Sequence, residues 1–490
     1  RLRSKRKRSV VMAKYDANLV VIGAGSGGLV SSLIAAAVKS KVILIERHKM
    51  GGDCLNTGCV PSKAILRSAK VASMMNRAEE FGIEPVEVKP VFSKVMKRVH
   101  KIIETIEPHD SIERFTGLGV ECVTGEAEII DKHTVRVGDR DIRTKSIIIA
   151  AGARPFVPPI EGVQEIDYLT SDNVWELEEL PERLVVLGGG PIGCELSQAF
   201  AKLGSKVTMV EMMGQLMGRE DADVANLITE KFKQDGISVL TDHKAVKFIN
   251  DGDTALQCET ADGLVEIPFD KVLIAVGRKA NSDGMNLEQL GIKLRRNGTI
   301  ETDEYLRTDV PNIFAVGDIA GPYQFTHTAS HQAWFATVNA LFGFAKKFKV
   351  DYRVIPWATF TMPEVARVGL SEREAEEKGI AVQVSHYGID DLDRAITDGE
   401  AHGFIKVLTP KNGKDTILGV TIVGSHAGEL IAEYVLAMKH NLGLNKILGT
   451  IHLYPSMAEA NKFVAGNWKR ENQPHGLLKW VGKFHTWRRG

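Results

Sequence analysis

Runs of apolar residues alternate with glycine turns and apolar helical segments at two places in the chain. Residues 18–46, NLVVIGAGSGGLVSSLIAAAVKSKVILIE, have the pattern of a strand, a glycine turn, a helix and a second strand. Residues 183–211, RLVVLGGGPIGCELSQAFAKLGSKVTMVE, repeat this order. Strands that alternate with helices in this way form parallel sheets. The pattern therefore predicts two α/β units.

Both units carry the glycine spacing of a pyrophosphate-binding turn, GxGxxG. Such glycines permit a tight turn, close approach of a pyrophosphate and close packing of helix on strand, and an acid at the end of the second strand accepts from a ribose hydroxyl. Two such units predict two bound dinucleotides, with a purely structural second unit as the alternative. The residues concerned are Gly23, Gly25, Gly28 and Glu46 in the first unit, and Gly188, Gly190, Gly193 and Glu211 in the second.

The acid of the second unit also indicates which nicotinamide cofactor is used. Glu211 can bind a free 2′-hydroxyl but repels a 2′-phosphate, for which an arginine is expected. Arg219 lies too far along the chain to take that place. The sequence therefore favours NADH over NADPH.

Length, charge and cysteine content narrow the class of protein. A chain of 490 residues exceeds what one hydrophobic core organises, so several domains are expected. Its 62 basic and 62 acidic residues balance, which argues against a nucleic-acid binder. Of five cysteines, only Cys54 and Cys59 lie close together, and no zinc-like partner pair accompanies them. His327 and His331 have the spacing of two residues lining a helix, so no metal site is predicted.

The cysteine pair follows the first α/β unit. A helix is expected from about Pro61, since proline fits the first turn of a helix, and this places Cys59 near a helix N-terminus. There the helix dipole stabilises a thiolate. The pair is suited to cycling between dithiol and disulfide, and a flavin can carry two electrons to it from a nicotinamide. We therefore expect a relay from nicotinamide through flavin and disulfide to an outside acceptor, with a structural disulfide as the alternative.

Residues 51–64, GGDCLNTGCVPSKA, resemble the active-site segment of the class I pyridine nucleotide–disulfide oxidoreductases. Residues 147–155 (IIIAAGARP), 272–281 (VLIAVGRKAN) and 313–321 (IFAVGDIAG) resemble further motifs of that family. The resemblance implies an α/β protein with two Rossmann-like domains, for FAD and NAD, and a C-terminal α+β dimerisation domain. The implied boundaries are 13–157 with 278–350 for FAD, 158–277 for NAD(P), and 351–490 for dimerisation.

The resemblance also implies roles for single residues. Cys54 would be the interchange thiol that meets substrate, and Cys59 the charge-transfer thiol beside the flavin. Lys63 and Glu195 would form an ion pair near the flavin, and Asp318 would bind its ribityl chain. Two further glycines, Gly152 and Gly277, belong to the cofactor motifs.

The C-terminal segment departs from the pattern of disulfide-reducing members, which carry a catalytic His-Pro followed by a Glu. In IHLYPSMAEA (451–460), Glu459 matches, but Tyr454 occupies the histidine position. A phenol titrates at about pH 10 and is a poor base at neutral pH. His452 could replace the base only after a local rearrangement. By resemblance, Tyr454 and Glu459 would reach the flavin site of a second subunit, which implies a homodimer.

Three functions remain open at this stage. The first is a mercuric-reductase-like reductase whose acceptor is a metal ion, an electrophile or a quinone. True mercuric reductases typically end in a vicinal cysteine pair, and this chain has no cysteine after Cys258. The second is a dihydrolipoamide dehydrogenase, and the third is a membrane-associated flavin-bearing interaction module with little turnover. An active dithiol suits a reducing interior, so a cytoplasmic location is expected, with possible membrane association.

Both ends of the chain carry basic segments. In GLLKWVGKFHTWRRG (476–490), Leu477, Trp480, Val481 and Phe484 have helical spacing, with lysines elsewhere around the helix. Residues 471–490 could therefore form an interfacial helix on an anionic membrane, or a stripe that packs on the protein's own surface. The basic run at 1–8 fits either a position on the cytoplasmic side of a preceding membrane segment or a solvated tail.

Overall fold

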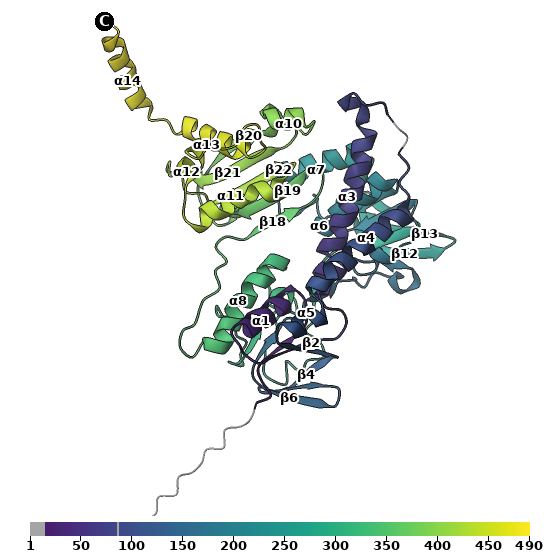
Figure 1. Ribbon diagram of the computed structural model, residues 1–490. Coiled ribbons are helices and arrows are strands. Elements are labelled where there is room, and N and C mark those ends of the chain that lie inside the picture. Colours follow the sequence, from purple (N-terminus) through teal and green to yellow (C-terminus); the bar gives the residue numbers. More distant parts are fainter. Residues whose placement is uncertain (1–14, 86–87) are drawn as a thin grey trace, which may run out of the picture. The chain divides into compact units, whose positions relative to one another are not determined.

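A computed structural model describes residues 15–85 and 88–490, which form two compact units (Figure 1). The basic run at 1–8 lies outside the described residues. Of the described residues, unit 1 comprises 15–60, Lys101–Arg154 and Arg278–Val350, and unit 2 comprises those of 61–100, Pro155–Gly277 and Asp351–Gly490.

Unit 1 is built on a seven-stranded sheet with the order β3-β2-β1-β6-β5-β4, in which β17 also pairs with β6. β1 lies between β2 and β6 and is parallel to both, while β4, β5 and β6 pair antiparallel. The bounds are β1 (Ala17–Ile22), β2 (Val42–Glu46), β3 (Val120–Thr124), β4 (Ala127–Asp131), β5 (Thr134–Val137), β6 (Arg140–Ile149) and β17 (Ile313–Ala315). A separate two-stranded sheet joins β7 (Ala153–Pro155) to β16 (Arg278–Ala280).

Both faces of β1 are buried, which explains its continuous run of apolar residues. Leu19 and Val21 belong to the apolar cluster that includes residues of α1 (Ser26–Ala37) and α8 (Thr326–Phe342). Val20 and Ile22 belong to a second cluster on the other face. The helices α1 and α8 lie side by side (Figure 1). The short helix α5 (Ile112–Gly117) contacts β3.

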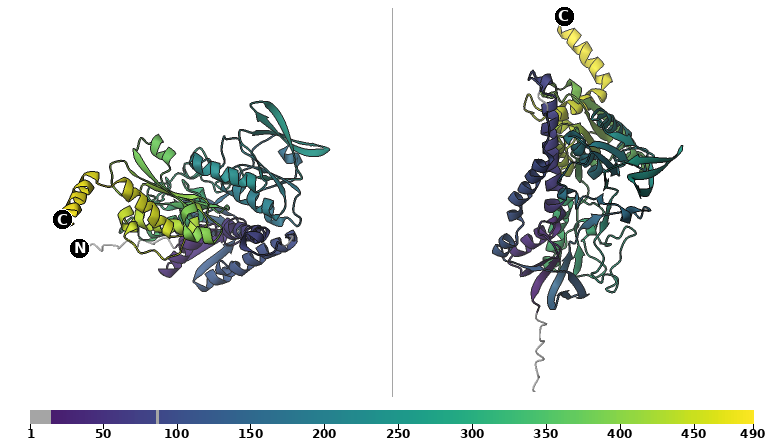
Figure 2. Two further views of the ribbon diagram at one scale, coloured as in Figure 1. Left: turned by 90° about the horizontal axis from the view of Figure 1, so that it is seen from above. Right: turned by 90° about the vertical axis from the view of Figure 1, so that its right-hand side faces the viewer.

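Unit 2 repeats the parallel arrangement in a five-stranded sheet of order β11-β10-β9-β15-β8. A three-stranded antiparallel sheet, β12-β13-β14, accompanies it and projects at one side in Figure 2. The bounds are β8 (Tyr168–Leu169), β9 (Arg183–Leu187), β10 (Lys206–Val210), β11 (Ser238–Leu240), β12 (Lys244–Asp251), β13 (Asp253–Thr260), β14 (Gly263–Pro268), β15 (Lys271–Ile274), α6 (Pro191–Leu203) and α7 (Ala222–Gln234). Two further helices, α3 (Cys59–Asn76) and α4 (Phe92–Ile106), belong partly to unit 1 and partly to unit 2.

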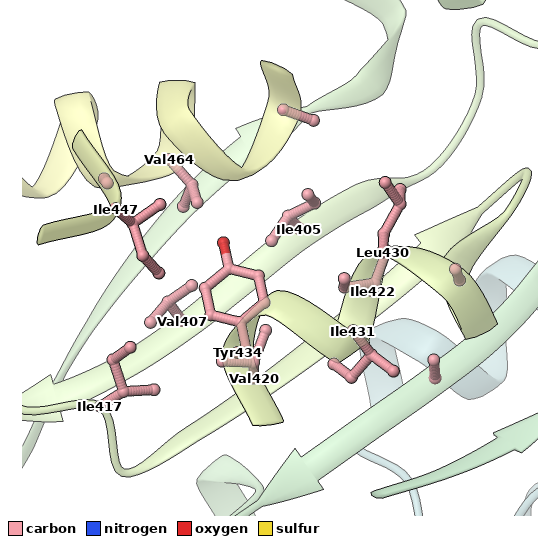
Figure 3. Packing of buried hydrophobic residues seen from close by; sticks show 14 of the residues in the cluster. Ile405, Val407, Ile417, Val420, Ile422, Leu430, Ile431, Tyr434, Ile447 and Val464 are labelled. Atoms are coloured by element: carbon pink, nitrogen blue, oxygen red, sulfur yellow. The ribbon is translucent and has the colours of Figure 1, made fainter. Parts of the chain in front are cut away.

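The C-terminal part of unit 2 is an antiparallel sheet of order β18-β19-β22-β21-β20 covered by helices. Figure 3 shows the core, where Val407 and Val420 of the sheet meet Tyr434 of α11 and Val464 of α13. The bounds are β18 (Pro356–Thr359), β19 (Glu364–Gly369), β20 (Val382–Gly388), β21 (Phe404–Pro410), β22 (Gly419–Gly424), α9 (Glu372–Glu377), α10 (Asp393–Thr397), α11 (Ala427–Lys439), α12 (Leu444–Leu448), α13 (Glu459–Glu471) and α14 (His475–Arg488).

The predicted C-terminal helix is present as α14, but it does not pack on the rest of unit 2. None of its residues is buried. Its aromatic stripe therefore does not pack on the surface of its own chain, and the alternative that it packs at a dimer edge stays a prediction. Among the described residues, no helix is long and apolar enough to cross a membrane.

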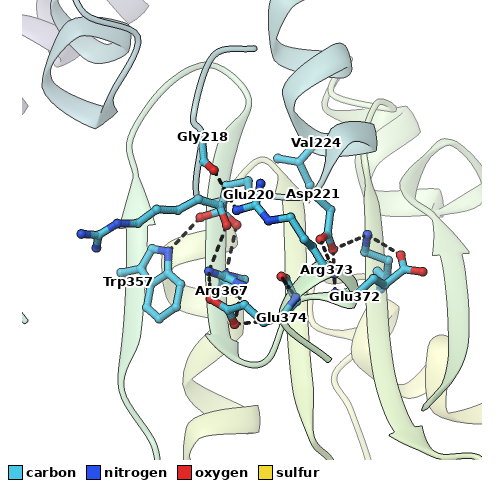
Figure 4. A network of polar contacts seen from close by, with 12 residues as sticks. Gly218, Glu220, Asp221, Val224, Trp357, Arg367, Glu372, Arg373 and Glu374 are labelled. Atoms are coloured by element: carbon cyan, nitrogen blue, oxygen red, sulfur yellow. Dashed lines mark hydrogen bonds and ion pairs between the residues drawn. The ribbon is translucent and has the colours of Figure 1, made fainter. Parts of the chain in front are cut away.

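A buried cation from β19 binds the segment that precedes α7 (Figure 4). The Arg367 side chain is 1% exposed and lies 3.1 Å from Glu220 and 3.1 Å from Glu374. Trp357 donates from Nε1 to Glu220 at 2.9 Å, and its ring lies 4.3 Å from the Arg367 guanidinium carbon. Burial raises the pKa of Glu220, and Arg367 opposes that rise.

Lys406 of β21 makes a second such contact with the same segment. Its side chain is 2% exposed, and Nζ lies 2.9 Å from Asp221, 2.8 Å from Asp223 and 2.8 Å from Glu372. Burial opposes the charge on Lys406, but hydrogen bonds with these three carboxylates outweigh burial and raise its pKa. Two buried cations therefore fix residues 220–223 against the C-terminal sheet.

Replacing Lys406 with methionine should destabilise unit 2, because it leaves three carboxylates together without a cation. Removing one partner of a buried ion pair lowers the free energy of unfolding by about 3–5 kcal/mol. Because Asp223 and Glu372 are half-exposed, we expect a loss at the lower end of this range. The midpoint of urea unfolding, followed by circular dichroism, measures the effect. Lys411→Met removes an exposed lysine just after the same strand and is the matched control. Equal midpoints for the two variants would contradict the role given to Lys406.

Candidate functional site

The first glycine turn packs α1 tightly against the sheet of unit 1. Gly23 has φ of 99°, and a Cβ atom there would lie 2.5 Å from the carbonyl oxygen of Ala150. A Cβ atom on Gly28 would lie 1.8 Å from the carbonyl oxygen of Gly23. Gly25 differs, because its Cβ position is open and only the Cα atom of Gly52, at 3.9 Å, is near. The turn thus leaves space directly before the N-terminus of α1, where backbone N–H groups can bind a pyrophosphate.

The second turn, in unit 2, has the same geometry. A Cβ atom on Gly188 would lie 2.5 Å from the carbonyl oxygen of Ala275, and one on Gly193 would lie 2.0 Å from the carbonyl oxygen of Gly188. Nothing lies within 4 Å of the Cβ position of Gly190, which precedes α6. Both turns therefore fit a dinucleotide pyrophosphate.

The two predicted ribose-binding acids are also held in the same way. Glu46 accepts hydrogen bonds from the backbone N–H groups of Ala24 at 2.7 Å and His48 at 2.8 Å. Glu211 accepts from those of Gly189 at 2.6 Å and Met213 at 2.8 Å. Each carboxylate oxygen retains a second lone pair that can accept from a ribose hydroxyl. The backbone thus orients both acids at the mouth of their turn.

Arg278, which was not among the predicted site residues, links three parts of unit 1. It pairs with Asp53, donates to the carbonyl oxygen of Ala153 at 2.6 Å, and lies 3.4 Å from Asp318. Burial raises the pKa of Asp318, and Arg278 opposes that rise. The signal that could have found Arg278 is its place in the VGRKAN segment. Of the two motif glycines, Gly152 lies between β6 and β7 with φ of 66°, and Gly277 directly precedes β16 with φ of 140°.

The cysteine pair lies in unit 1. Cys54 belongs to α2 (Gly52–Asn56), and Cys59 is the first residue of α3, as predicted. The Cys59 sulfur lies 3.4 Å from the hydroxyl of Thr326, which is the first residue of α8. Two helix N-termini and one hydroxyl therefore meet at Cys59, and all three favour negative charge on its sulfur.

The surroundings of Cys54 oppose ionisation of its thiol. The hydrogen bond with Cys59 and then burial raise the pKa of Cys54 far above its usual range. Both causes favour the protonated form of Cys54. Burial also raises the pKa of the three remaining cysteines, to about 11 for Cys258. Cys59 is thus the cysteine best placed to be a thiolate at neutral pH.

The predicted ion pair between Lys63 and Glu195 is present in unit 2. Lys63 Nζ lies 2.8 Å from Glu195 Oε2 and 4.4 Å from the centre of the Phe360 ring. The other carboxylate oxygen of Glu195 accepts from the backbone N–H of Phe360 at 2.9 Å. The pair is therefore fixed by α3, α6 and the end of β18. Its role beside a flavin stays a prediction.

The C-terminal candidates form two separate groups in unit 2. Tyr454 and Glu459 line one cavity of about 480 Å³. The Tyr454 hydroxyl donates to Asp393 at 3.0 Å, and this bond raises the pKa of Tyr454. His452 lies elsewhere, with Nδ1 3.1 Å from the carbonyl oxygen of Thr450 and Nε2 3.0 Å from Glu433. The structure therefore pairs His452 with Glu433 and not with Glu459.

Comparison with known proteins gives consistent matches over most of the chain. A family model described as pyridine nucleotide-disulphide oxidoreductase matches residues 17–333, and the dimerisation-domain model of that family matches 355–464. The chain is 35% identical over 451 residues to the dihydrolipoyl dehydrogenase of Chlamydia muridarum, which covers 90% of this chain and 94% of that protein. It is 34% identical over 451 residues to the mercuric reductase of Staphylococcus aureus, with 92% of this chain and 82% of that protein covered.

A solved structure also matches. It is the Cu(II) complex of the HOCl-induced flavoprotein disulfide reductase RclA from Escherichia coli, with a TM-score of 0.81 and 27% identity. The match covers 91% of this chain and 98% of that chain.

We expect Thr326→Val to slow the reaction of Cys59 with iodoacetamide at neutral pH by about tenfold or more, measured in a FAD-loaded Cys54→Ser background. The thiolate is the reactive form, and losing a hydrogen bond to a charged acceptor costs about 1.5–3 kcal/mol. Thr326→Ser should restore the rate. Thr328→Val is the matched control, because Thr328 is buried two residues further along α8 and its hydroxyl has no partner among the described residues. A rate unchanged by Thr326→Val would exclude this role for the hydroxyl.

Proposed function

Because the chain belongs to the pyridine nucleotide-disulphide oxidoreductase family, we propose that it passes electrons from NADH through FAD to the Cys54–Cys59 pair and on to a thiol-binding metal ion. Members of this family are FAD-dependent enzymes that use NAD(P)H, so the predicted family, three-part fold, enzyme class and cofactors are confirmed. The dimerisation-domain match supports the predicted homodimer. The domain boundaries and residue roles stay predictions.

The observation that carries this proposal is the position of Cys59 at the N-termini of α3 and α8, 3.4 Å from the Thr326 hydroxyl, beside a Cys54 thiol whose pKa is raised. FAD, when bound, would supply two-electron transfer between a nicotinamide and a disulfide. One hydride equivalent converts the disulfide into one thiol and one thiolate, with no further proton. Cys54, whose pKa is raised, takes the proton, and Cys59, at two helix N-termini, keeps the negative charge. The protein thus stabilises the products of reduction in one defined arrangement.

The protonated state of Cys54 favours an acceptor that needs no general base. A metal ion that binds a thiol displaces its proton directly. With Cu(II), two ions would each take one electron, the S–S bond would form again, and the Cys54 proton would be released. The names of the mercuric reductase relatives and of the Cu(II)-bound RclA structure support a metal ion as acceptor.

Exchange with a disulfide substrate instead requires a base that moves protons to and from the interchange thiol. Tyr454 is unsuited, because its hydroxyl donates to Asp393 and its pKa is raised. Both ring nitrogens of His452 lie against oxygen atoms, of the Thr450 carbonyl and the Glu433 carboxylate, so a thiol can reach either nitrogen only when one of these contacts is given up.

A dihydrolipoamide dehydrogenase is the second candidate, and the contact between His452 and Glu433 favours it. A carboxylate that orients an imidazole is the usual arrangement of a histidine base. Glu433 holds His452 at 3.0 Å, and Asn461 donates to Glu433 at 2.8 Å. Freeing Nδ1 from the Thr450 carbonyl would complete a working base. The relatives named dihydrolipoyl dehydrogenase support this candidate.

The preference for NADH rests on Glu211 and the residues after it. The sequence continues Met212-Met213 and has no basic side chain before Arg219. The Arg219 carbonyl accepts from Arg367 at 3.2 Å. No cation of this segment therefore follows Glu211 closely enough to neutralise a 2′-phosphate.

NADH oxidation by the FAD-loaded protein tests the acceptor. We expect Cu(II) or Hg(II) to support steady oxidation, and Cys54→Ser or Cys59→Ser to abolish it, while His452→Ala leaves it unchanged. Dihydrolipoamide-dependent NAD⁺ reduction should stay at background. Brisk dihydrolipoamide turnover that disappears in His452→Ala would select the second candidate, and metal-dependent turnover that survives both cysteine variants would refute the relay.

Glu211→Ala should lower kcat/KM for NADH by about tenfold or more, because it removes hydrogen bonds to a charged acceptor. The effect on NADPH should be smaller or of opposite sign, since the substitution also removes repulsion of the 2′-phosphate. Steady-state kinetics with both coenzymes measure this. Glu46→Ala, in the other turn, is the contrasting variant and should alter FAD retention instead.

A further inference from the structure

The helix α14 presents large apolar side chains to solvent. Trp487 is 77% exposed, Trp480 64%, Leu477 57% and Phe484 40%. The helix follows α13 and ends the chain (Figures 1 and 2), and it contributes no residue to the core of unit 2. Exposed aromatic side chains grouped in this way indicate an interaction surface.

These side chains share one face of the helix. Trp480, Phe484 and Trp487 are spaced by four and three residues, which places them on adjacent turns of the same side. The Trp480 and Phe484 ring centres are 6.1 Å apart and nearly parallel, and those of Phe484 and Trp487 are 6.0 Å apart. Leu477 extends this face one turn toward the start of the helix.

The charge around the face has a single sign. No aspartate or glutamate occurs after Glu471, whereas Lys479, Lys483, Arg488 and Arg489 are all cationic. Lys479 and Lys483 are four residues apart and lie together at one edge of the apolar face. The Arg488 guanidinium carbon lies 5.9 Å from the Phe484 ring, at the other edge.

We propose that α14 lies flat on an anionic phospholipid surface, with its aromatic face in the headgroup region and its cations facing lipid phosphates. Tryptophan is favoured at the membrane–water interface, and flexible lysine side chains reach the headgroups while their stems cover apolar surface. Fourteen residues rise about 21 Å, too short to span a hydrocarbon core of about 30 Å. The helix therefore binds the surface without crossing the membrane.

The charge pattern favours lipid over a second copy of α14 as the occupant. Two copies meeting through this face would bring their cations together, and α14 has no acidic side chain to pair with them. An anionic surface instead neutralises all the cations at once. This proposal does not depend on the identity of the electron acceptor.

Sedimentation of the FAD-loaded full chain with vesicles tests the proposal. We expect binding to phosphatidylglycerol-containing vesicles that is at least about tenfold stronger than binding to pure phosphatidylcholine, weakens with salt, and shifts tryptophan emission to shorter wavelength. Trp480→Ala with Phe484→Ala should abolish binding. Lys479→Gln with Lys483→Gln should weaken it by about tenfold or more.

Phe344→Ala is the matched control, because Phe344 is an 87% exposed aromatic side chain beside Lys346 and Lys347 but lies outside α14. It should bind like the parent protein, and all variants should keep their FAD content. Binding that persists in both double variants would overturn the proposal. Loss of a higher oligomer in the aromatic variant, without any vesicle binding by the parent, would assign the face to a second copy instead and would also overturn it.

Discussion

In each glycine turn, a helix approaches the end of a strand so closely that a glycine is required, because only a hydrogen atom fits in place of a side chain. A Cβ atom at Gly28 or Gly193 would fall about 2 Å or less from a carbonyl oxygen, well inside van der Waals contact. This approach fixes where α1 and α6 begin and leaves Gly25 and Gly190 open. It also brings Ala24 and Gly189 within reach of Glu46 and Glu211, so the predicted pyrophosphate and ribose positions follow from one packing constraint.

Helix N-termini also determine the surroundings of the thiol pair. Cys59 begins α3, and Thr326 begins α8, so the two positive helix ends act on one sulfur. At the neighbouring Cys54, the hydrogen bond with Cys59 and burial raise the pKa of the thiol and outweigh the opposing hydrogen bond with Thr326. Position at helix ends, burial and the hydrogen bond between the thiols therefore give two chemically identical side chains, five residues apart, different surroundings.

Features that depend on neighbouring residues could be predicted from the sequence, and features that depend on distant ones could not. The two turns, their acids and the start of α3 each follow from a short motif with its flanking strand or helix. The partners of the site residues come from far along the chain: Thr326 is 267 residues from Cys59, Arg278 is 225 from Asp53, and Lys406 is 185 from Asp221. No periodicity relates such residues. The helical spacing of residues 477–487 predicted α14, but spacing alone did not determine whether its apolar face would be covered.

The two buried cations of the C-terminal sheet have a consequence for coenzyme binding. The ten-residue step from Glu211 to Asp221 is held at its first end by the glycine turn and at its far end by Arg367 and Lys406. A segment fixed at both ends loses its conformational entropy when the protein folds, and that entropy is not lost again when a ligand binds. If Glu211 binds the coenzyme ribose as proposed, the C-terminal sheet, although remote in sequence, would contribute to coenzyme affinity by preorganising that acid.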